Sequence, residues 1–259
     1  PPRYLLGAGS PAGKDTDISK LGIVQGHAYA VLDVAEVSDR NGNHELLCLR
    51  NPWGQTEWKG AWGDEDTARW TRRVQAKLNY KPAATAKDRD DGLFWMTFSD
   101  FTRHFQSIYI CRVFNPQVWH KYVGRSEWKG KTAGGAPGNK TAANNPQFVV
   151  EVSEPTKVFA TLTQDGMGRG EELHISMFIV YKEGGRVKGL YRSDNFHSSG
   201  TFMNAKSVSV ECELTPDAGG WTLFPCVFHA GKEAKFHITL YTDRPLVNAG
   251  PDGTLKALD

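Results

Sequence analysis

Short segments with the composition of β-strands recur through the second half of this 259-residue chain. They constrain its fold more than any other feature. Each is rich in β-branched or aromatic residues, and glycine- or proline-rich turns separate one from the next. Helical periodicity disappears from Trp119 onward, and the strand-like segments are 147–152, 157–163, 173–181, 207–213, 221–228 and 234–242. This spacing predicts an antiparallel β-sandwich of about eight strands.

The first part of the chain predicts a β-hairpin. Residues 23–37 and 45–50 have the composition of strands, and Pro52 ends the second one. Between them, 39–43 reads Asp-Arg-Asn-Gly-Asn, which is a strong turn signal because Asn and Gly adopt positive φ at little cost.

A helix and further short elements are expected after the hairpin. Trp70, Val74 and Leu78 recur four residues apart and predict a helix over 64–80, capped by Asp64, Asp66 or Thr67. The remaining expectations are a loop at 81–91, a strand at 94–98, a helical turn with Phe101 and Phe105, and a strand at 107–114.

The predicted fold class is therefore mainly β. An α+β subdomain with an antiparallel or barrel-like sheet and short helices occupies 1–116, a β-sandwich occupies 117–247, and 248–259 is expected to be a flexible tail. A chain of this length is large enough for two separate cores.

Composition excludes several classes of protein. With 31 basic and 29 acidic residues the net charge is +2, so no overall field attracts nucleic acid. No apolar run is long enough to cross a membrane. The four cysteines are widely spaced without a CxxC pair, which favours reduced thiols and a cytoplasmic location. The start at Pro1 lacks both a Met and a signal peptide, so we expect a portion of a longer protein.

Two polar residues are candidates for chemistry. His27 lies on a predicted strand between Gly26 and Ala28, whose small side chains would leave the imidazole accessible as a general base. Asn51 lies at the end of the next strand, where its side-chain carbonyl could orient an imidazole. Taken singly, His27 is equally well explained as a structural histidine, and Asn51 as part of an ordinary turn before Pro52.

The hairpin register decides whether these two side chains can meet. They face each other if the pairing is centred near Asp39, with a loop from about Ala35 to Asn43. A tight turn at Asn41-Gly42 would instead shift Asn51 along its strand. We predict the longer loop, with His27 and Asn51 adjacent.

Several motifs in this order resemble the calpain family of cysteine proteases. They are Gly26-His27-Ala28-Tyr29, Arg50-Asn51-Pro52-Trp53-Gly54, Glu57-Trp58-Lys59-Gly60-Ala61-Trp62, Gly92-Leu93-Phe94-Trp95-Met96 and Phe98-Ser99-Asp100-Phe101. Their spacing is similar to the second half of the calpain protease core, through about Phe114. Asn144-Asn145-Pro146-Gln147-Phe148 and the β-rich part resemble the C2-like domain that follows the core.

The resemblance implies a papain-type Cys-His-Asn endopeptidase acting on protein or peptide substrates. His27 would move the proton, Asn51 would orient His27, and Trp53 would cover their contact. In the family the nucleophilic Cys lies in the first core subdomain, upstream of this chain, so the chain alone is expected to be inactive. Cys48 and Cys111 have no cationic or helix-start setting that would make either a nucleophile. The alternative is a catalytically inactive calpain-like scaffold or interaction module.

Calcium is the cofactor that the resemblance implies. Its ligands would be Glu57, Asp64 and Asp91, since Ca²⁺ prefers carboxylate oxygens. Leu93 stands where many members have Glu, and Arg89 places a cation nearby, so the site is weakened. A helix cap and solvated loop carboxylates explain the same residues. Histidine spacings indicate no zinc site.

The sandwich offers two weaker signals. The glycine-rich loop 164–172 carries three acids but lacks Asp-x-Asp spacing, which favours a hairpin loop over a metal site. Scattered basic residues could give weak contact with a membrane surface, although such residues usually serve solubility. They are Lys129, Lys131, Lys140, Lys182, Arg186 and Lys188.

Overall fold

The computed structural model describes residues 3–39, 42–81, 91–166, 168, 170–182, 185–191, 194–216 and 220–258. It divides into two compact units, Pro1–Val113 and Phe114–Asp259. The sequence places this boundary after residue 116. The structure places it earlier because Phe114 stacks on Tyr241 of the sandwich, with ring centroids 3.9 Å apart and an interplanar angle of 8°.

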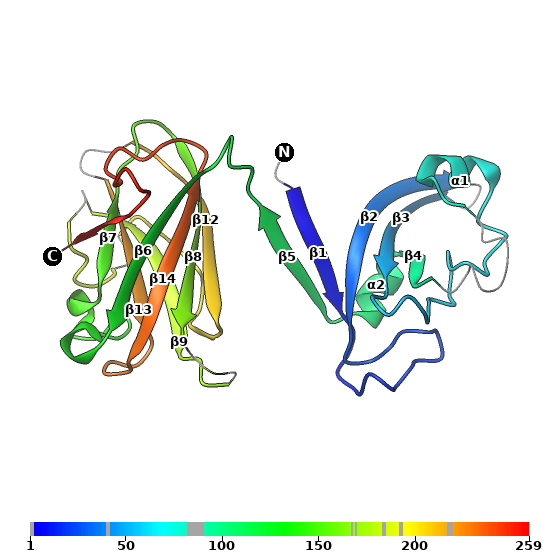
Figure 1. Ribbon diagram of the computed structural model, residues 1–259, viewed down its shortest axis with the longest axis horizontal. Helices are drawn as coiled ribbons and strands as arrows, with labels where there is room; N and C mark the ends of the chain where they lie inside the picture. Colours follow the sequence, from blue (N-terminus) through cyan, green and yellow to red (C-terminus); the bar gives the residue numbers. More distant parts are fainter. Residues whose placement is uncertain are drawn as a thin grey trace. The chain divides into compact units, whose positions relative to one another are not determined.

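The first unit is built on an open, five-stranded antiparallel sheet (Figure 1). The strand order is β4-β3-β2-β1-β5. The strands are β1 (Arg3–Gly9), β2 (Ala28–Asp39), β3 (Gly42–Arg50), β4 (Leu93–Thr97) and β5 (Ser107–Val113), and the helices are α1 (Arg72–Leu78) and α2 (Phe98–His104). Strand β1 was not expected from the sequence, and β2 begins later than the predicted residue 23.

The hairpin turn is shorter than predicted. Strands β2 and β3 stay paired as far as Asp39 and Gly42, so the predicted loop over 35–43 is wrong. Residues 40 and 41 lie outside the described residues. A bulge at Leu32, between the pairs Val31–Leu49 and Asp33–Cys48, shifts the register by one residue. The short turn is therefore compatible with His27 and Asn51 lying at the same end of the sheet.

The predicted helix over 64–80 is also shorter in the structure. Residues 64–71 form turns, in which the Asp66 carboxylate accepts hydrogen bonds from the Trp62 backbone N–H and from Arg69. Thr71, rather than Asp64, Asp66 or Thr67, caps α1 by accepting from the N–H of Val74. Because the Asp66 carboxylate already accepts these two hydrogen bonds, it does not cap the helix.

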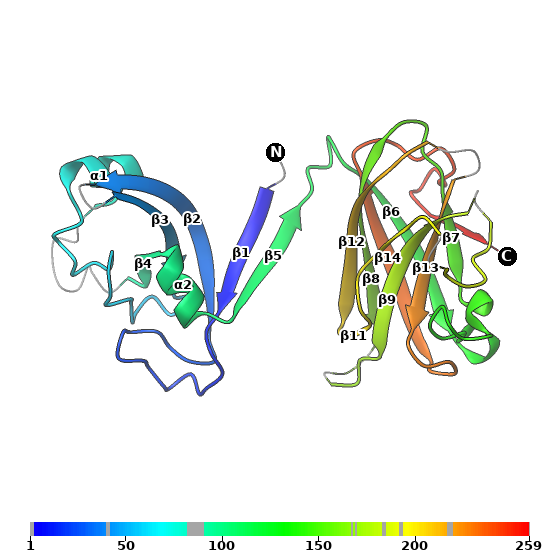
Figure 2. The same ribbon diagram turned by 180° about the vertical axis from the view of Figure 1, so that it is seen from behind.

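The second unit is a sandwich of two antiparallel sheets, seen from both sides in Figures 1 and 2. One sheet has the order β12-β8-β14-β6 and the other β10-β9-β13-β7-β15, with β11 also paired to β9. The bounds are β6 (His120–Trp128), β7 (Gln147–Val150), β8 (Thr156–Asp165), β9 (His174–Tyr181), β10 (Phe196–Ser198), β11 (Met203–Asn204), β12 (Ser207–Leu214), β13 (Trp221–Val227), β14 (Ala234–Thr242) and β15 (Lys256–Leu258). Two 3₁₀ turns lie at Gly130–Thr132 and Ala142–Asn144.

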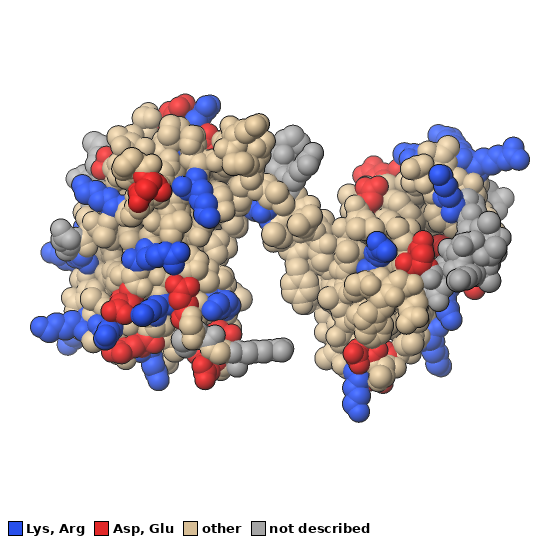
Figure 3. All heavy atoms as spheres, viewed as in Figure 1, with Lys and Arg blue, Asp and Glu red and all other residues tan. Residues whose placement is uncertain are grey.

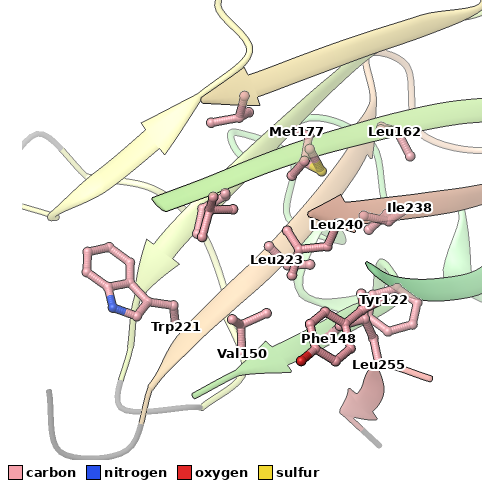
Figure 4. Packing of buried hydrophobic residues seen from close by; sticks show 14 of the residues in the cluster. Tyr122, Phe148, Val150, Leu162, Met177, Trp221, Leu223, Ile238, Leu240 and Leu255 are labelled. Carbon is pink, nitrogen blue, oxygen red and sulfur yellow. The ribbon is translucent and has the colours of Figure 1, made fainter. Parts of the chain in front are cut away.

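Alternating side chains of the two sheets form the sandwich core (Figure 4). In β8, Val158, Ala160 and Leu162 point inward, while the residues between them are more exposed. Ile238 and Leu240 of β14 do the same beside them, and Met177 and Leu223 come from the opposite sheet. This period of two is what a half-buried strand requires, and it confirms the predicted mainly β fold.

The C-terminal segment, predicted to be a flexible tail, is instead part of the sandwich. Strand β15 pairs with β7, joining Lys256 to Val149 and Leu258 to Gln147. Leu255 is buried in the core, and the Arg186 guanidinium donates to the carbonyl of Leu258. Backbone pairing and one buried leucine therefore hold a segment whose Gly-Pro-Asp-Gly start resembles a loose end.

Candidate active site

His27 is anchored by its main chain immediately before β2. The hydroxyl of Ser10 accepts a hydrogen bond from the His27 N–H (2.9 Å) and donates one to the His27 carbonyl (3.1 Å). The N–H of Ser10 also donates to that carbonyl (3.0 Å). Ser10 is buried although it is polar. One residue of the preceding segment therefore fixes both peptide groups that flank the imidazole.

Asn51 follows β3 and meets His27, as predicted. The Nε2 atom of His27 lies 2.9 Å from Oδ1 of Asn51, whose side chain is 0% exposed. Among the described residues, Nδ1 of His27 has no hydrogen-bond partner. With Asn51 accepting at Nε2, the neutral ring carries its proton there and presents a basic nitrogen on its other side.

Two aromatic rings pack against the imidazole. The ring of Trp53 lies 4.3 Å from it, centroid to centroid, and is itself 47% exposed. Tyr29, buried on β2, contacts it edge-on at 5.2 Å, and the Tyr29 hydroxyl accepts from the N–H of Val24. Burial raises the pKa of Tyr29, so its hydroxyl stays protonated and acts only as a hydrogen-bonding group.

Gly92 ties the Asn51 loop to the start of β4. The N–H of Asn51 donates to the carbonyl of Gly92, and the N–H of Gly92 donates to the Glu57 carboxylate, both at 2.7 Å. Gly92 has φ of +84°, and a Cβ added there would lie 2.6 Å from the carbonyl oxygen of Asn51. Only glycine therefore allows this close approach.

The three carboxylates predicted to bind calcium lie around this loop. Glu57 accepts from Gly92, Asp64 accepts from the Tyr80 hydroxyl (3.3 Å), and Asp91 accepts from the N–H of Leu93 (2.8 Å). Burial is the main cause that raises the pKa of Glu57 to about 7. The hydrogen bond from Gly92 opposes this shift, and the charges of Asp64 and Asp91 add to it.

The chemistry of these carboxylate donors suits Ca²⁺. No group of three or more His, Cys, Asp or Glu side chains is arranged to hold a metal ion within the described part of the chain. Arg89, which was expected to weaken the site, lies outside the described residues. Calcium binding therefore stays a prediction, and no step below depends on it.

One acidic residue near this region was missed from the sequence. Asp33 of β2 lines a cavity of about 280 Å³ together with Asp64, Asp91 and Cys48. Its carboxylate accepts from the N–H of Val34. The bulge at Leu32 changes which β2 residues face this side, and no sequence pattern announces it.

The four cysteines are free and lie in different settings. Burial raises the pKa of both Cys48 and Cys212 to about 12, and it also raises the pKa of Cys226. The charge of Asp33 contributes next at Cys48, and that of Glu211 at Cys212. These three are therefore thiols rather than thiolates at neutral pH, and Cys111 is exposed on β5.

The glycine-rich loop of the sandwich uses its acids locally. Glu171 accepts from the N–H of Gly168 and Glu172 from that of Gly170, while Asp165 lies 2.8 Å from Nδ1 of His237. Met167 and Arg169 lie outside the described residues. The described contacts are those of a hairpin loop.

The predicted basic residues of the sandwich differ in their surroundings. Lys182 pairs with Asp194 (3.1 Å), and Arg186 donates to the carbonyls of Ala143 and Asn145. The other four are exposed: Lys129, Lys131, Lys140 and Lys188. On the face of this unit that Figure 3 shows, Lys and Arg side chains are scattered among Asp and Glu rather than gathered into one field.

Comparison with known proteins gives two matches along the chain. Residues 2–112 match the family described as "Calpain family cysteine protease", and residues 124–241 match "Calpain large subunit, domain III". The described residues contain no helix that is long and apolar enough to span a membrane.

Similar proteins come from plants and animals. The chain is 37% identical to the "Calpain-type cysteine protease ADL1" of Oryza sativa subsp. japonica over 94% of its own length and 12% of that protein. It is equally similar, with the same coverage, to the "Calpain-type cysteine protease DEK1" of Arabidopsis thaliana. It is 32% identical to "Calpain-5" of Mus musculus over 86% of its own length and 38% of that protein.

The chain thus spans only about an eighth of the plant relatives and little more than a third of the mouse one. Both of its units match calpain domains, with the protease core first and domain III second. This is the order that the sequence motifs predict. The chain belongs to the calpain family of cysteine proteases.

Proposed function

We propose that this chain supplies the His–Asn half of the active site of an intracellular calpain-type cysteine endopeptidase, with a nucleophilic Cys outside the chain. The observation that carries the proposal is the 2.9 Å contact between Nε2 of His27 and Oδ1 of the fully buried Asn51. A hydrogen bond shielded from water holds the ring more firmly than an exposed one.

In this function His27 acts at Nδ1. It takes the proton of the cysteine thiol, and the resulting thiolate attacks the carbonyl carbon of the substrate peptide. His27 then gives that proton to the leaving amine as the C–N bond breaks, which leaves a thioester. Water, deprotonated by His27, hydrolyses the thioester and releases the thiol.

Asn51 and Trp53 serve His27 rather than the substrate. Asn51 accepts the Nε2 proton and so keeps the ring oriented while it carries a second proton at Nδ1. Trp53 lies against the ring and limits the access of water to this hydrogen bond. Both roles are part of the proposal.

The state of the cysteines supports a nucleophile from elsewhere. Cys48, Cys212 and Cys226 have raised pKa values caused by burial, which is the opposite of what a nucleophilic thiol needs. Cys111 is exposed on β5, and its described hydrogen bond is a long contact with the carbonyl of Arg112. The chain by itself should therefore show no proteolysis.

The test uses the complete parent protein. His27→Ala should abolish peptide cleavage, and Asn51→Ala should lower kcat by about 100-fold. The matched control is His120→Ala, which removes an exposed histidine at the start of β6 and should leave cleavage unchanged. Full cleavage by the His27→Ala variant would overturn the proposal. A parent that never cleaves peptides would support the inactive scaffold instead.

Contact between the sandwich and an anionic membrane surface is a second, weaker proposal. The observation that favours it is that Lys129 and Lys131, two positions apart at a 3₁₀ turn, are both exposed. Vesicles containing anionic lipid should retain the chain at low salt and lose it when both lysines are changed to Glu. Changing Lys182, which is paired with Asp194, should have less effect. Equal retention of all three proteins would exclude this surface.

A further inference from the structure

Every hydrogen-bonding position of the Asn51 side chain is occupied. Its oxygen accepts from His27 and from the N–H of Trp53 (3.0 Å). Its nitrogen donates to the carbonyl of Gln55 (2.6 Å), and lies 3.3 Å from both the carbonyl and the hydroxyl oxygen of Thr56. An amide offers two acceptor and two donor positions, so none remains.

These partners permit only one orientation of the Asn51 amide. The N–H of Trp53 can only donate, and the carbonyls of Gln55 and Thr56 can only accept. If the amide turned over, its NH₂ would face the Trp53 N–H and its oxygen would face two carbonyl oxygens. Asn51 is 0% exposed, so water could not compensate for these lost hydrogen bonds.

The orientation of this amide determines the tautomer of His27. With the Asn51 oxygen facing it, Nε2 must carry the proton, and the neutral ring is left with a lone pair at Nδ1. With the NH₂ group facing it, the proton would move to Nδ1 and the ring could not accept a proton there. The groups that hold the amide therefore control which ring nitrogen is the base.

The two carbonyls converge because of an uncommon backbone conformation. Thr56 has φ of +61°, in the left-handed region that β-branched residues rarely adopt. Its hydroxyl donates to the carbonyl of Gln55 (2.5 Å) and so braces the same turn. A conformation of this kind persists only where the surrounding contacts determine it.

We propose that the Gln55–Thr56 turn is a positioning element for His27. Its two carbonyls select the orientation of the Asn51 amide, and through it the tautomer of His27 that has a free Nδ1. The catalytic meaning of this inference rests on the proposed function, whereas the tautomer itself is a property of this chain.

The experiment measures the tautomer directly. In the ¹⁵N-labelled 259-residue chain, the two ring nitrogens of His27 have different NMR shifts when protonated and when bare. At a pH where the imidazole is neutral, the unmodified chain should show a protonated Nε2 and a bare Nδ1. A protonated Nδ1 in this chain would overturn the proposal without any variant.

Three substitutions of Thr56 then test the turn. Proline fixes φ near about −65°, so Thr56→Pro should displace both carbonyls and give a mixture of His27 tautomers. Asn tolerates the left-handed region, so Thr56→Asn should keep the single tautomer. A folded Thr56→Pro chain with the tautomer unchanged would overturn the proposal.

Thr56→Gly covers the case in which Thr56→Pro does not fold. Glycine accepts the left-handed conformation but does not hold it. The Asn51 side-chain NH₂ protons should exchange with solvent about tenfold faster in Thr56→Gly than in Thr56→Asn. Equal exchange rates in these two variants would overturn the proposal.

Asn79→Pro is the matched control for stability. Asn79 also has a left-handed backbone, with φ of +49°, but it ends α1. Asn79→Pro should destabilise the chain and leave the His27 tautomer unchanged. If it altered the tautomer as much as Thr56→Pro does, the effect would be general loosening and the proposal would fail.

In the complete protease, Thr56→Pro should lower kcat by about 100-fold with little change in KM. The Thr56→Asn variant should keep a kcat close to that of the unmodified protease. If the parent proves inactive, the proposed function fails while the NMR result still decides the role of the turn. If the parent is active and Thr56→Pro is too, the positioning role fails alone.

Discussion

At the scale of single residues, the candidate active site depends on small groups with several contacts each. Ser10 makes three hydrogen bonds to the two peptide groups of His27, and Gly92 connects Asn51 to Glu57. Ser10 could not be found from the sequence, and Gly92 could be found only as part of a motif, without its contacts to Asn51 and Glu57. Ser10 lies 17 positions before His27 and belongs to no motif with it, while His27 and Asn51 were found because they stand in recognisable motifs.

Ser10→Ala should weaken the anchoring of His27. The change removes a hydroxyl that both donates to and accepts from His27, and leaves the His27 N–H without that partner. We expect the free energy of unfolding of the chain to fall by about 1–2 kcal/mol, measured by urea denaturation. Ser10→Thr keeps the hydroxyl, so its free energy of unfolding should fall by less than that of Ser10→Ala. Equal losses for the two variants would mean that the hydroxyl is not the anchor.

Gly92→Ala should be among the more damaging small substitutions in the first unit. The added Cβ would lie 2.6 Å from the Asn51 carbonyl oxygen and 2.9 Å from the Cα of Gly54, and backbone atoms cannot move aside easily. We expect a loss of about 2 kcal/mol or more in the free energy of unfolding. Gly42→Ala is the control, since Gly42 also has positive φ but nothing lies within 4 Å of its added Cβ. Similar losses would show that φ alone, rather than the close approach, requires glycine.

At the scale of elements, strands with clear alternation were predictable and strands without it were not. Strand β14 was predicted with its observed bounds, 234–242, because buried and more exposed residues alternate along it. Strand β6 was missed because its sequence mixes charged residues with Gly124. That glycine packs under the ring of Phe148, where a Cβ would lie 2.8 Å from the ring. Strand β1 was missed because Tyr4, Leu5 and Leu6 are consecutive apolar residues, so its sequence does not alternate.

The hairpin illustrates a second limit. Sequence could indicate that β2 and β3 pair, and it offered both a tight turn and a long loop. It could not show the bulge at Leu32, because a bulge changes the register without a required residue type. The adjacency of His27 and Asn51 was therefore predicted correctly, but through the wrong turn.

The loop that follows Asn51 should make stability depend on pH through Glu57. Its pKa in the folded chain is raised to about 7 from an ordinary value of 4.5, so the folded state binds a proton more tightly than the unfolded state. This group's contribution is therefore most favourable below the unfolded pKa. It is lost as pH rises from about 4.5 to 7. Because the group is partly exposed, we expect the loss to be on the order of 1 kcal/mol.

Glu57→Gln isolates this contribution. The amide cannot ionise, so the decline between pH 4.5 and pH 7 should become shallower in urea denaturation of the variant. Asp64 and Asp91 face the same carboxylate and remain as charged groups in both proteins. Equal slopes in the two proteins would mean that Glu57 has an ordinary pKa. A stabilising effect of added Ca²⁺ that disappears in Glu57→Gln would support the calcium prediction.

At the scale of the whole molecule, each unit has its own hydrophobic core. In the first unit, one cluster includes Leu49, Phe94 and Met96 and another includes Trp62 and Trp70. The sandwich has a larger cluster that includes Leu162, Ile238 and Leu240. This agrees with the two calpain matches along the chain, and with a division that could be predicted from the change in pattern near Trp119.

Separate cores predict separate responses to core mutations. Leu49 and Leu162 are both 0% exposed, one in each unit, and truncating either to Ala should cost about 2–5 kcal/mol. In calorimetry, Leu162→Ala should lower the melting temperature of one transition and Leu49→Ala that of another. The NMR signals of His27, which lies in the first unit, show which transition belongs to that unit. On heating, they should persist through the lowered transition of Leu162→Ala and disappear with the lowered transition of Leu49→Ala. If both variants shifted a single transition equally, the two units would unfold as one, and the first unit could not be treated as a fold of its own.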